Sequence, residues 1–187
     1  RHSFWIEYGG MRHTIRDAET IRDELFRISI GLWNYAKNHN PNTRQINRNA
    51  RLVWLNYVAG TRESRRIYGD YVMTQNDFDN QTLTPDRVAF TDWGIDVHHP
   101  EGFWVKGNDC LHVYHGRRTC IPYRTLYARD IDNLFIAGRC HSATQLAFGA
   151  TRGVRPVCMM GQAVGTAASL AKKHRTTPRG IHKDHIE

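Results

Sequence analysis

Several features that would narrow the function of this 187-residue chain are missing from its sequence. The four cysteines contain no C-x-x-C pair, which argues against a structural zinc site and against a dithiol redox motif. We expect them to be small buried hydrophobic residues, although a Cys110–Cys120 disulfide in an exported form stays open. The eleven histidines lack the i, i+4 spacing of a helical metal site, so no metal is expected.

Long apolar runs are also missing. No run approaches the roughly 20 residues that a transmembrane helix needs, so no membrane association is expected. The chain begins without an initiator methionine or a signal segment, which indicates a processed or truncated start and leaves the compartment open. A hydrophobic content of 40% with 24% charged residues is typical of a globular protein of one large or two small domains.

The net charge of +8 raises the question of a nucleic-acid partner. The basic residues are scattered, however, and the sequence has no helix-turn-helix, zinc-finger or RNA-recognition signature. An acidic small molecule would suit a basic cleft equally well. We therefore expect no nucleic-acid partner and keep a basic nucleic-acid-binding domain only as a minor alternative.

The stretch from Asn133 to Ala171 organises the rest of the chain. A short apolar run, residues 134–137, is bounded by Gly138 and predicts a buried strand. A polar loop follows, and residues 157–173 then form a helical segment of small side chains. On that helix Gly161, Gly165 and Ala168 share one face, which would allow close packing against a sheet or another backbone. The unit is thus a strand, a polar loop and a side-chain-poor helix.

Two amphipathic helices are predicted upstream. Apolar residues recur at helical spacing from Ile21 to Tyr35, after a possible capping box at residues 14–17. A second stripe runs from Ile46 to Tyr57 and should stop near Gly60. Residues 67–77 alternate loosely like a strand. Both helices are expected to be scaffold.

The sequence contains a series of short motifs, in the order Trp5-Ile6-Glu7-Tyr8-Gly9-Gly10, Arg62-Glu63-Ser64-Arg65-Arg66, Gly69-Asp70-Tyr71, Ile121-Pro122-Tyr123-Arg124, Asn133-Leu134, Ala137-Gly138-Arg139, Ser142-Ala143, Ala147-Phe148-Gly149, Arg152 and Met160-Gly161-Gln162-Ala163. Their order along nearly the whole chain resembles that of the bacterial FAD-dependent oxidoreductase family, flavoproteins of the two-dinucleotide-binding type.

This resemblance implies an α/β fold, seen here as an α+β fragment, with FAD as cofactor. Residues 1–115 would belong to a mixed helix and sheet substrate-binding domain. Residues 116–175 would be the C-terminal strand–loop–helix of a Rossmann-like FAD-binding domain, and residues 176–187 a polar tail with a short helix. The family has more chain on both sides, so we expect a piece of a larger enzyme that transfers hydride from a small polar, carbohydrate-like substrate to the flavin.

The same resemblance assigns roles to particular residues. The start of the small-residue helix, near residues 158–162, would approach the flavin ring with its open N–H groups. Backbone and charge of the loop would contact the cofactor, and the upstream charged and aromatic segments would hold the substrate. The expected cofactor contacts are Gly138, Arg139, Ser142, Gly161 and Gln162. The substrate contacts that the resemblance implies are Glu7, Arg62, Arg65 and Gln145. His98 and His99 are expected to bind substrate for a different reason: ring nitrogens in an irregular, aromatic-rich loop suit a polyhydroxylated ligand, although the loop could equally be ordinary surface.

Catalysis is expected from Arg152 and His141, and here the sequence departs from the family. Gln145 stands where the family commonly has a histidine, and an amide cannot act as a general base at neutral pH. His141 could take over proton abstraction, or it could simply be a packed histidine.

The second departure is larger. The G-x-G-x-x-G loop that seats the adenosine diphosphate half of FAD does not occur in the sequence. A missing N-terminal segment or another chain would have to supply it. A non-catalytic glycan- or anion-binding module on the same fold remains the alternative function.

Overall fold

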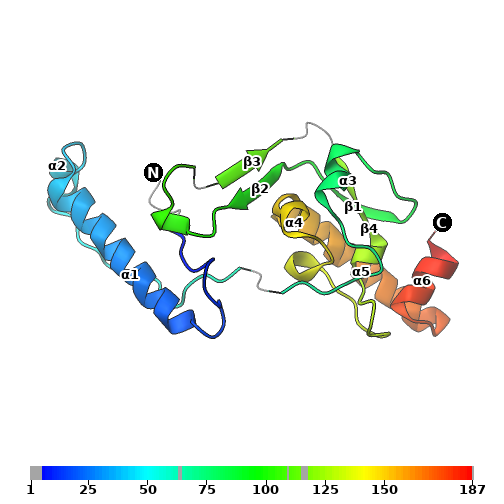
Figure 1. Cartoon of the computed structure of the whole chain (residues 1–187). Helices are drawn as coiled ribbons and strands as arrows, with labels where there is room; N and C mark the ends of the chain where they lie inside the picture. Colours follow the sequence, from blue (N-terminus) through cyan, green and yellow to red (C-terminus); the bar gives the residue numbers. More distant parts are fainter. Residues whose placement is uncertain (1–5, 63–64, 109, 115–117, 187) are drawn as a thin grey trace. The chain divides into compact units, whose positions relative to one another are not determined.

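The structure is a computed structural model in which the chain forms two compact units (Figure 1). Unit 1 comprises residues 1–64 and 98–109, and unit 2 comprises residues 65–97 and 110–187. The residues that the structure describes are 6–62, 65–108, 110–114 and 118–186. Within these ranges no helix is both long and apolar enough to cross a bilayer. No group of three or more His, Cys, Asp or Glu side chains in the same ranges is arranged to hold a metal ion.

Unit 1 is built around the helix α1 (Ala18–Asn34), which continues into a π-helical turn, Tyr35–His39. The predicted apolar stripe is confirmed, and Ile21 and Ile28 are its buried members. The predicted capping box does not form. Asp17 stands at the N-cap, and its carboxylate instead accepts a hydrogen bond from the backbone N–H of His13.

The second predicted helix of unit 1 is wrong. Only α2 (Arg44–Asn47) is helical, and residues 51–62 contain no helix. The ammonium of Lys37 donates to the carbonyl oxygens of Asn47, Arg48 and Ala50. A continuing helix would need these carbonyls for its own hydrogen bonds. A side chain from the preceding helical turn therefore satisfies the carbonyl groups at the end of α2.

Among its described residues, unit 2 contains two small strand pairs and four α-helices. Strand β1 (Arg87–Thr91) pairs antiparallel with β4 (Thr119–Pro122), with an irregularity between Arg87 and Ala89. Strand β2 (Ile95–His98) pairs with β3 (Cys110–Val113). The helices are α3 (Gln75–Asp79), α4 (Gln145–Thr151), α5 (Val154–His174) and α6 (Pro178–His185). This mixture of helices and small sheets agrees with the predicted α/β fragment.

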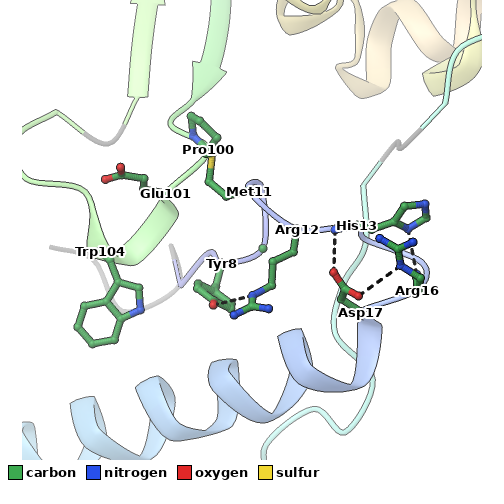
Figure 2. A pocket seen from close by; sticks show the side chains of 10 residues that line it. Tyr8, Met11, Arg12, His13, Arg16, Asp17, Pro100, Glu101 and Trp104 are labelled. Carbon is green, nitrogen blue, oxygen red and sulfur yellow. Dashed lines mark hydrogen bonds and ion pairs between the residues drawn. The ribbon is translucent and has the colours of Figure 1, made fainter.

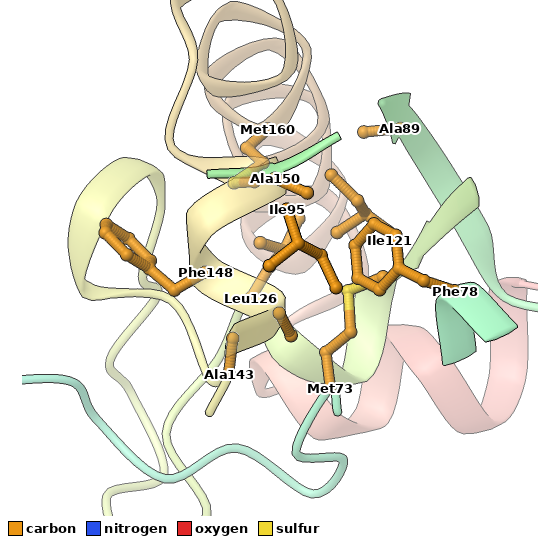
Figure 3. Close-up of a cluster of buried hydrophobic side chains, with 11 residues drawn as sticks. Met73, Phe78, Ala89, Ile95, Ile121, Leu126, Ala143, Phe148, Ala150 and Met160 are labelled. Carbon is orange, nitrogen blue, oxygen red and sulfur yellow. The ribbon is translucent and has the colours of Figure 1, made fainter. Parts of the chain in front are cut away.

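One hydrophobic cluster forms the centre of unit 2 (Figure 3). It joins residues from nearly every element of the unit, so their packing depends on one another. Met73 precedes α3, Ile121 belongs to β4, and Met160 lies on α5; each is fully buried. The remaining members are Phe78, Ala89, Ile95, Leu126, Ala143, Ala147, Phe148 and Ala150.

The helix α5 confirms the predicted small-residue helix but not the packing of its small-residue face. Its buried residues are Pro156, Met160 and Ala167, and this side packs on β1. Gly161 and Gly165 are exposed, and a Cβ atom built on either would meet nothing within 4 Å among the described residues. The helix therefore buries its larger side chains and leaves the small-residue face uncovered.

Two strand predictions in unit 2 are wrong. Residues 134–137 form only an isolated bridge, Tyr127 with Phe135, because the chain at residues 126–128 supplies the hydrogen-bond partners of Leu134 and Ile136. The 67–77 segment likewise keeps a single bridge, Met73 with Ala143, and then enters α3. Thr74 and Asp77 form a capping box there, which sets the start of α3.

The C-terminal residues form the expected short helix, α6, and it packs firmly on unit 2. Ile181 is fully buried between α5 and the turn Tyr123–Thr125, and the Tyr123 hydroxyl donates to the carbonyl of Pro178. Arg179 makes two hydrogen bonds to the carboxylate of Asp70, at 2.7 and 2.8 Å. The predicted boundaries at residues 115 and 175 do not coincide with the two structural units. The assignment of those segments to substrate and cofactor domains stays a prediction.

The cysteines are less buried than predicted. Cys110 and Cys158 are exposed, and Cys120 and Cys140 are half-buried. Cys120 is a free thiol, so the structure does not contain the Cys110–Cys120 disulfide that the sequence left open.

The carboxylate of Asp86, only 1% exposed, is held by Arg124. The guanidinium donates through Nε and Nη2 at 2.9 and 3.1 Å, and the backbone N–H of Arg124 donates at 3.0 Å. Burial alone would raise the pKa of Asp86, but the hydrogen bonds from Arg124 outweigh it, and the pKa is lowered. The arginine of the Ile121-Pro122-Tyr123-Arg124 motif thus neutralises a buried charge.

Removing that neutralising partner should be costly. We expect Arg124→Met to lower the free energy of unfolding by about 3 kcal/mol, because Asp86 would keep a buried carboxylate without its cation. The double variant with Asp86→Leu should lose less than the sum of the two single variants, as measured by urea denaturation. Arg65→Met, at an exposed arginine, is the matched control and should change little. Additive losses would contradict this account.

Candidate functional site

The loop of residues 138–144 in unit 2 is held between two extended segments by backbone hydrogen bonds. The N–H of Ser142 donates to the carbonyl of Thr125 at 3.0 Å, and the carbonyl of Ser142 accepts from Met73 at 3.1 Å. The N–H of Thr144 donates to Met73 at 2.8 Å, and Ile67 donates to Cys140 at 3.1 Å. The loop is therefore a fixed part of the unit and presents Arg139 to solvent, and Gln145, the first residue of α4, is also exposed.

At the start of this loop, Gly138 adopts φ +71°, a left-handed conformation that favours glycine. It opens the 3-10 turn Gly138–Cys140, whose N-cap residue is Ala137. The carbonyl of Gly138 accepts from the backbone N–H of His141 and lies 2.8 Å from the His141 Nδ1. The turn is thus closed from inside by a histidine ring.

The ring of His141 is fully buried, and both of its nitrogens are hydrogen-bonded. A carbonyl can only accept, so Nδ1 carries the proton, and Nε2 accepts from the Thr151 hydroxyl at 3.1 Å. Burial lowers the pKa of His141 to about 4, against the smaller opposing effect of the Gly138 hydrogen bond; the charge of Arg66 lowers it further. The ring is neutral at pH 7 and links the loop to the end of α4.

Several polar side chains lie near the His141 ring in unit 2. Arg66 donates to the Gln145 side-chain carbonyl at 3.3 Å, and its guanidinium lies over the Phe148 ring at 5.4 Å. The Ser142 hydroxyl is buried and has no hydrogen-bond partner among the described residues. A buried polar atom without a partner is unusual and is often explained by a ligand or an ordered water molecule.

Arg152 ends α4 and is half-buried. Its guanidinium pairs with the Asp96 carboxylate at 2.9 Å and donates to the Asp96 backbone carbonyl at 3.3 Å. These contacts fix the end of α4 to β2 within unit 2. Both contacts are made by the Arg152 Nη2 atom. Arg152 therefore anchors α4 within unit 2.

A family model described as FAD dependent oxidoreductase matches residues 4–187. The chain belongs to the FAD-dependent oxidoreductase family. Neither the curated proteins nor the solved structures give a match.

The family's motif on α5 lies deeper in the helix than predicted. Because α5 begins at Val154, Gly161 and Gln162 fall two turns inside it, where their N–H groups bond the preceding turn. The expectation that residues 158–162 offer open N–H groups is therefore wrong; the open groups belong to the first turn. Pro156, which has no N–H, lies in that first turn and marks the true start.

The residues predicted to hold the substrate of this oxidoreductase are only partly together. In unit 1, the Glu7 carboxylate lies 2.7 Å from the His98 Nδ1 and 3.3 Å from the Arg62 Nη2. His99 is exposed, and its Nδ1 accepts from the backbone N–H of Glu101. Three of the predicted residues thus form one polar cluster.

Arg65 and Gln145 belong to unit 2 instead, so the arginine run of the family motif is divided between the two units. Trp5, Glu63 and Ser64, which also belong to the motifs, lie outside the described residues. Sequence reasoning missed Thr151, the partner of His141, and Asp86, the partner of Arg124. A Thr-Pro-Asp turn at residues 84–86 was the only sign of the second.

The buried ring of His141 predicts a specific pH dependence. An unfolded histidine binds a proton near pH 6.5, but the folded His141 resists it down to about pH 4. The unfolded state therefore binds more protons between these values, and stability falls as the pH falls through that window. From pH 7 to pH 5 we expect His141 to account for a loss of about 2 kcal/mol in the free energy of unfolding.

His141→Asn keeps a donor near the Gly138 carbonyl and cannot titrate, so it should flatten the slope between pH 7 and pH 5 in urea denaturation. His39→Asn, at an exposed histidine of unit 1, should leave the slope unchanged. An unchanged slope in His141→Asn would show that the ring is protonated or solvated in the folded protein.

Proposed function

We propose that this chain supplies substrate-binding residues and the C-terminal FAD-binding segment of an oxidoreductase that oxidises a small polar, carbohydrate-like substrate. The observation that carries the proposal is the family match over residues 4–187, together with the loop and helix on which its motifs lie. FAD, when bound, would supply the hydride chemistry of the reaction. The chain's own residues would bind the cofactor and the substrate and hold them in position.

One side of unit 2 carries residues that suit the binding of a flavin cofactor. The left-handed Gly138 turn and the exposed Arg139 offer backbone and positive charge for the ribityl and diphosphate groups. The partnerless Ser142 hydroxyl fits a group that the protein itself does not provide. Gly161, with Gln162 beside it, leaves a side-chain-free area on α5 that a flat ring system can approach.

Within this proposal His141 is a positioning residue rather than the catalytic base. Its two nitrogens are used by Gly138 and Thr151, and its pKa of about 4 keeps it neutral. Arg152 likewise positions α4 through Asp96. The substrate would meet the cluster of Glu7, Arg62 and His98, whose carboxylate and guanidinium can bond to hydroxyl groups.

Adding a side chain at the small-residue face of α5 tests the cofactor assignment. We expect Gly161→Leu to leave the stability of the chain unchanged or higher, because Leu favours helix over Gly and meets nothing within 4 Å among the described residues. In the enzyme with its complete FAD-binding domain, the same change should weaken FAD binding roughly tenfold by overpacking.

Gly31→Leu, at an exposed glycine of α1, is the matched control and should not change the flavin content. Flavin absorbance after purification, with the dissociation constant from titration of the apoprotein, provides the measurement. Normal flavin binding in Gly161→Leu would remove this face from the cofactor site.

The absence of a G-x-G-x-x-G loop leads to a second test. The 187-residue chain alone should bind FAD weakly or not at all, because these residues do not include that adenosine diphosphate site. Co-expression with the complementary FAD-binding segment should restore flavin, and an oxidisable sugar or polyol should then bleach its absorbance under anaerobic conditions. A stoichiometric flavin spectrum from the chain alone would overturn the first expectation. A flavin that no such substrate bleaches would instead favour the binding-module alternative.

A further inference from the structure

A cavity of about 490 Å³ opens in unit 1, lined by residues of the segments 8–17 and 100–104 (Figure 2). One wall is the N-terminal loop with Tyr8 and Arg12, and the other is the turn from Pro100 to Trp104. Its volume lies within the range of small-molecule sites, about 300 to 1,000 Å³. Tyr8 and Trp104 add aromatic faces, which suit the carbon skeleton of a small ligand.

The two walls are joined by direct backbone contact, so the cavity is part of the folded unit. A Cβ atom at Gly10 would lie 2.6 Å from the carbonyl oxygen of Pro100, which only glycine permits. The N–H of Phe103 donates to the carbonyl of Glu7 at 2.7 Å. Binding would therefore not require the walls to assemble first.

The side chains of the walls are also oriented. The Arg12 Nε donates to the Tyr8 hydroxyl at 3.0 Å, and among the described residues its two terminal nitrogens have no hydrogen-bond partner. The Trp104 ring donates to Glu24 at 3.2 Å and meets Phe103 edge-on at 4.9 Å. A fixed guanidinium fork matches the two oxygens of a carboxylate.

The charged residues that line the cavity favour a carboxylate as the ligand group that binds Arg12. Asp17 is engaged by the His13 N–H and lies 3.7 Å from Arg16, so this acid and base largely offset each other. Arg12, on whose charge Asp17 and Glu24 also act, lies on one wall, and the exposed Glu101 lies on the other. A ligand with a carboxylate at one end and a hydrogen-bond donor at the other would complement both.

We propose that this cavity binds a small organic acid that also carries a hydroxyl or amino group, with its carboxylate on Arg12 and its donor group facing Glu101. The site concerns unit 1 alone and does not depend on flavin binding. The Tyr8 and Trp104 rings would contact the carbon skeleton of the ligand, and its two charged ends would set its orientation.

Isothermal titration of the full 187-residue chain with gluconate and with serine tests the site. Glucose and serinol, which lack the carboxylate, are the comparison ligands. At least one acid should bind at least about tenfold more tightly than its comparison ligand, because a charge-assisted fork adds that much affinity. Equal or undetectable binding of the acids and their comparison ligands would overturn the proposal.

The Arg12→Gln variant should remove this preference, whereas Arg51→Gln, at an exposed arginine elsewhere in unit 1, should keep it. Arg12→Lys keeps the charge without the fork and should fall between the two. Circular dichroism controls for folding, and Arg12 is itself exposed. An acid preference that survives in Arg12→Gln would place the carboxylate elsewhere and overturn the assignment.

Discussion

The hydrogen bonds of one buried neutral imidazole hold the motif loop of unit 2 in place. His141 closes the left-handed turn at Gly138 and reaches Thr151 at the end of α4, so a single ring connects the loop to the helix that follows it. Arg152, the next residue, continues this connection to β2 through Asp96. The loop can present Arg139 at its surface because its interior contacts are satisfied without it. A charged ring at this position would have to be desolvated, which is why burial and neutrality go together here.

The sequence predicted the helices whose apolar pattern is strong and local. Helix α1 follows its apolar stripe, and α5 contains the predicted segment of small residues. The failures arise where a group outside the segment itself decides the outcome. Lys37 caps the carbonyls at the end of α2, and the chain around Leu126 takes the place of a sheet neighbour for residues 134–137. Propensity cannot anticipate such partners, because it reports only the preferences of the residues within a segment.

The residues of the candidate site also fall into those that the sequence could predict and those that it could not. Glycine and loop positions could be found from motifs, since turns and close approach have local signatures. The partners of charged residues could not: Arg152 pairs with Asp96, and Arg124 pairs with Asp86, across long sequence separations. The arginine run at residues 62–66 reads as one cluster in the sequence, but its members fall in two units and Arg66 contacts Gln145. Charge on a sequence indicates that a partner exists, and the fold determines which.

Helix α5 explains why the family's motif combines bulky and small residues in one segment. An ordinary surface helix buries one stripe and covers the other face with charged side chains. On α5 the buried stripe packs on β1, but the opposite face carries Gly161, Gly165 and Ala168, and Val154 at its start is 81% exposed. When exposed to solvent, such a face contributes little to stability, because its side chains are neither charged nor large. It is suited to contact on both sides, which is the situation of a helix between a sheet and a bound cofactor or a second layer. The proposed cofactor role of Gly161 and Gln162 follows from this two-sided character.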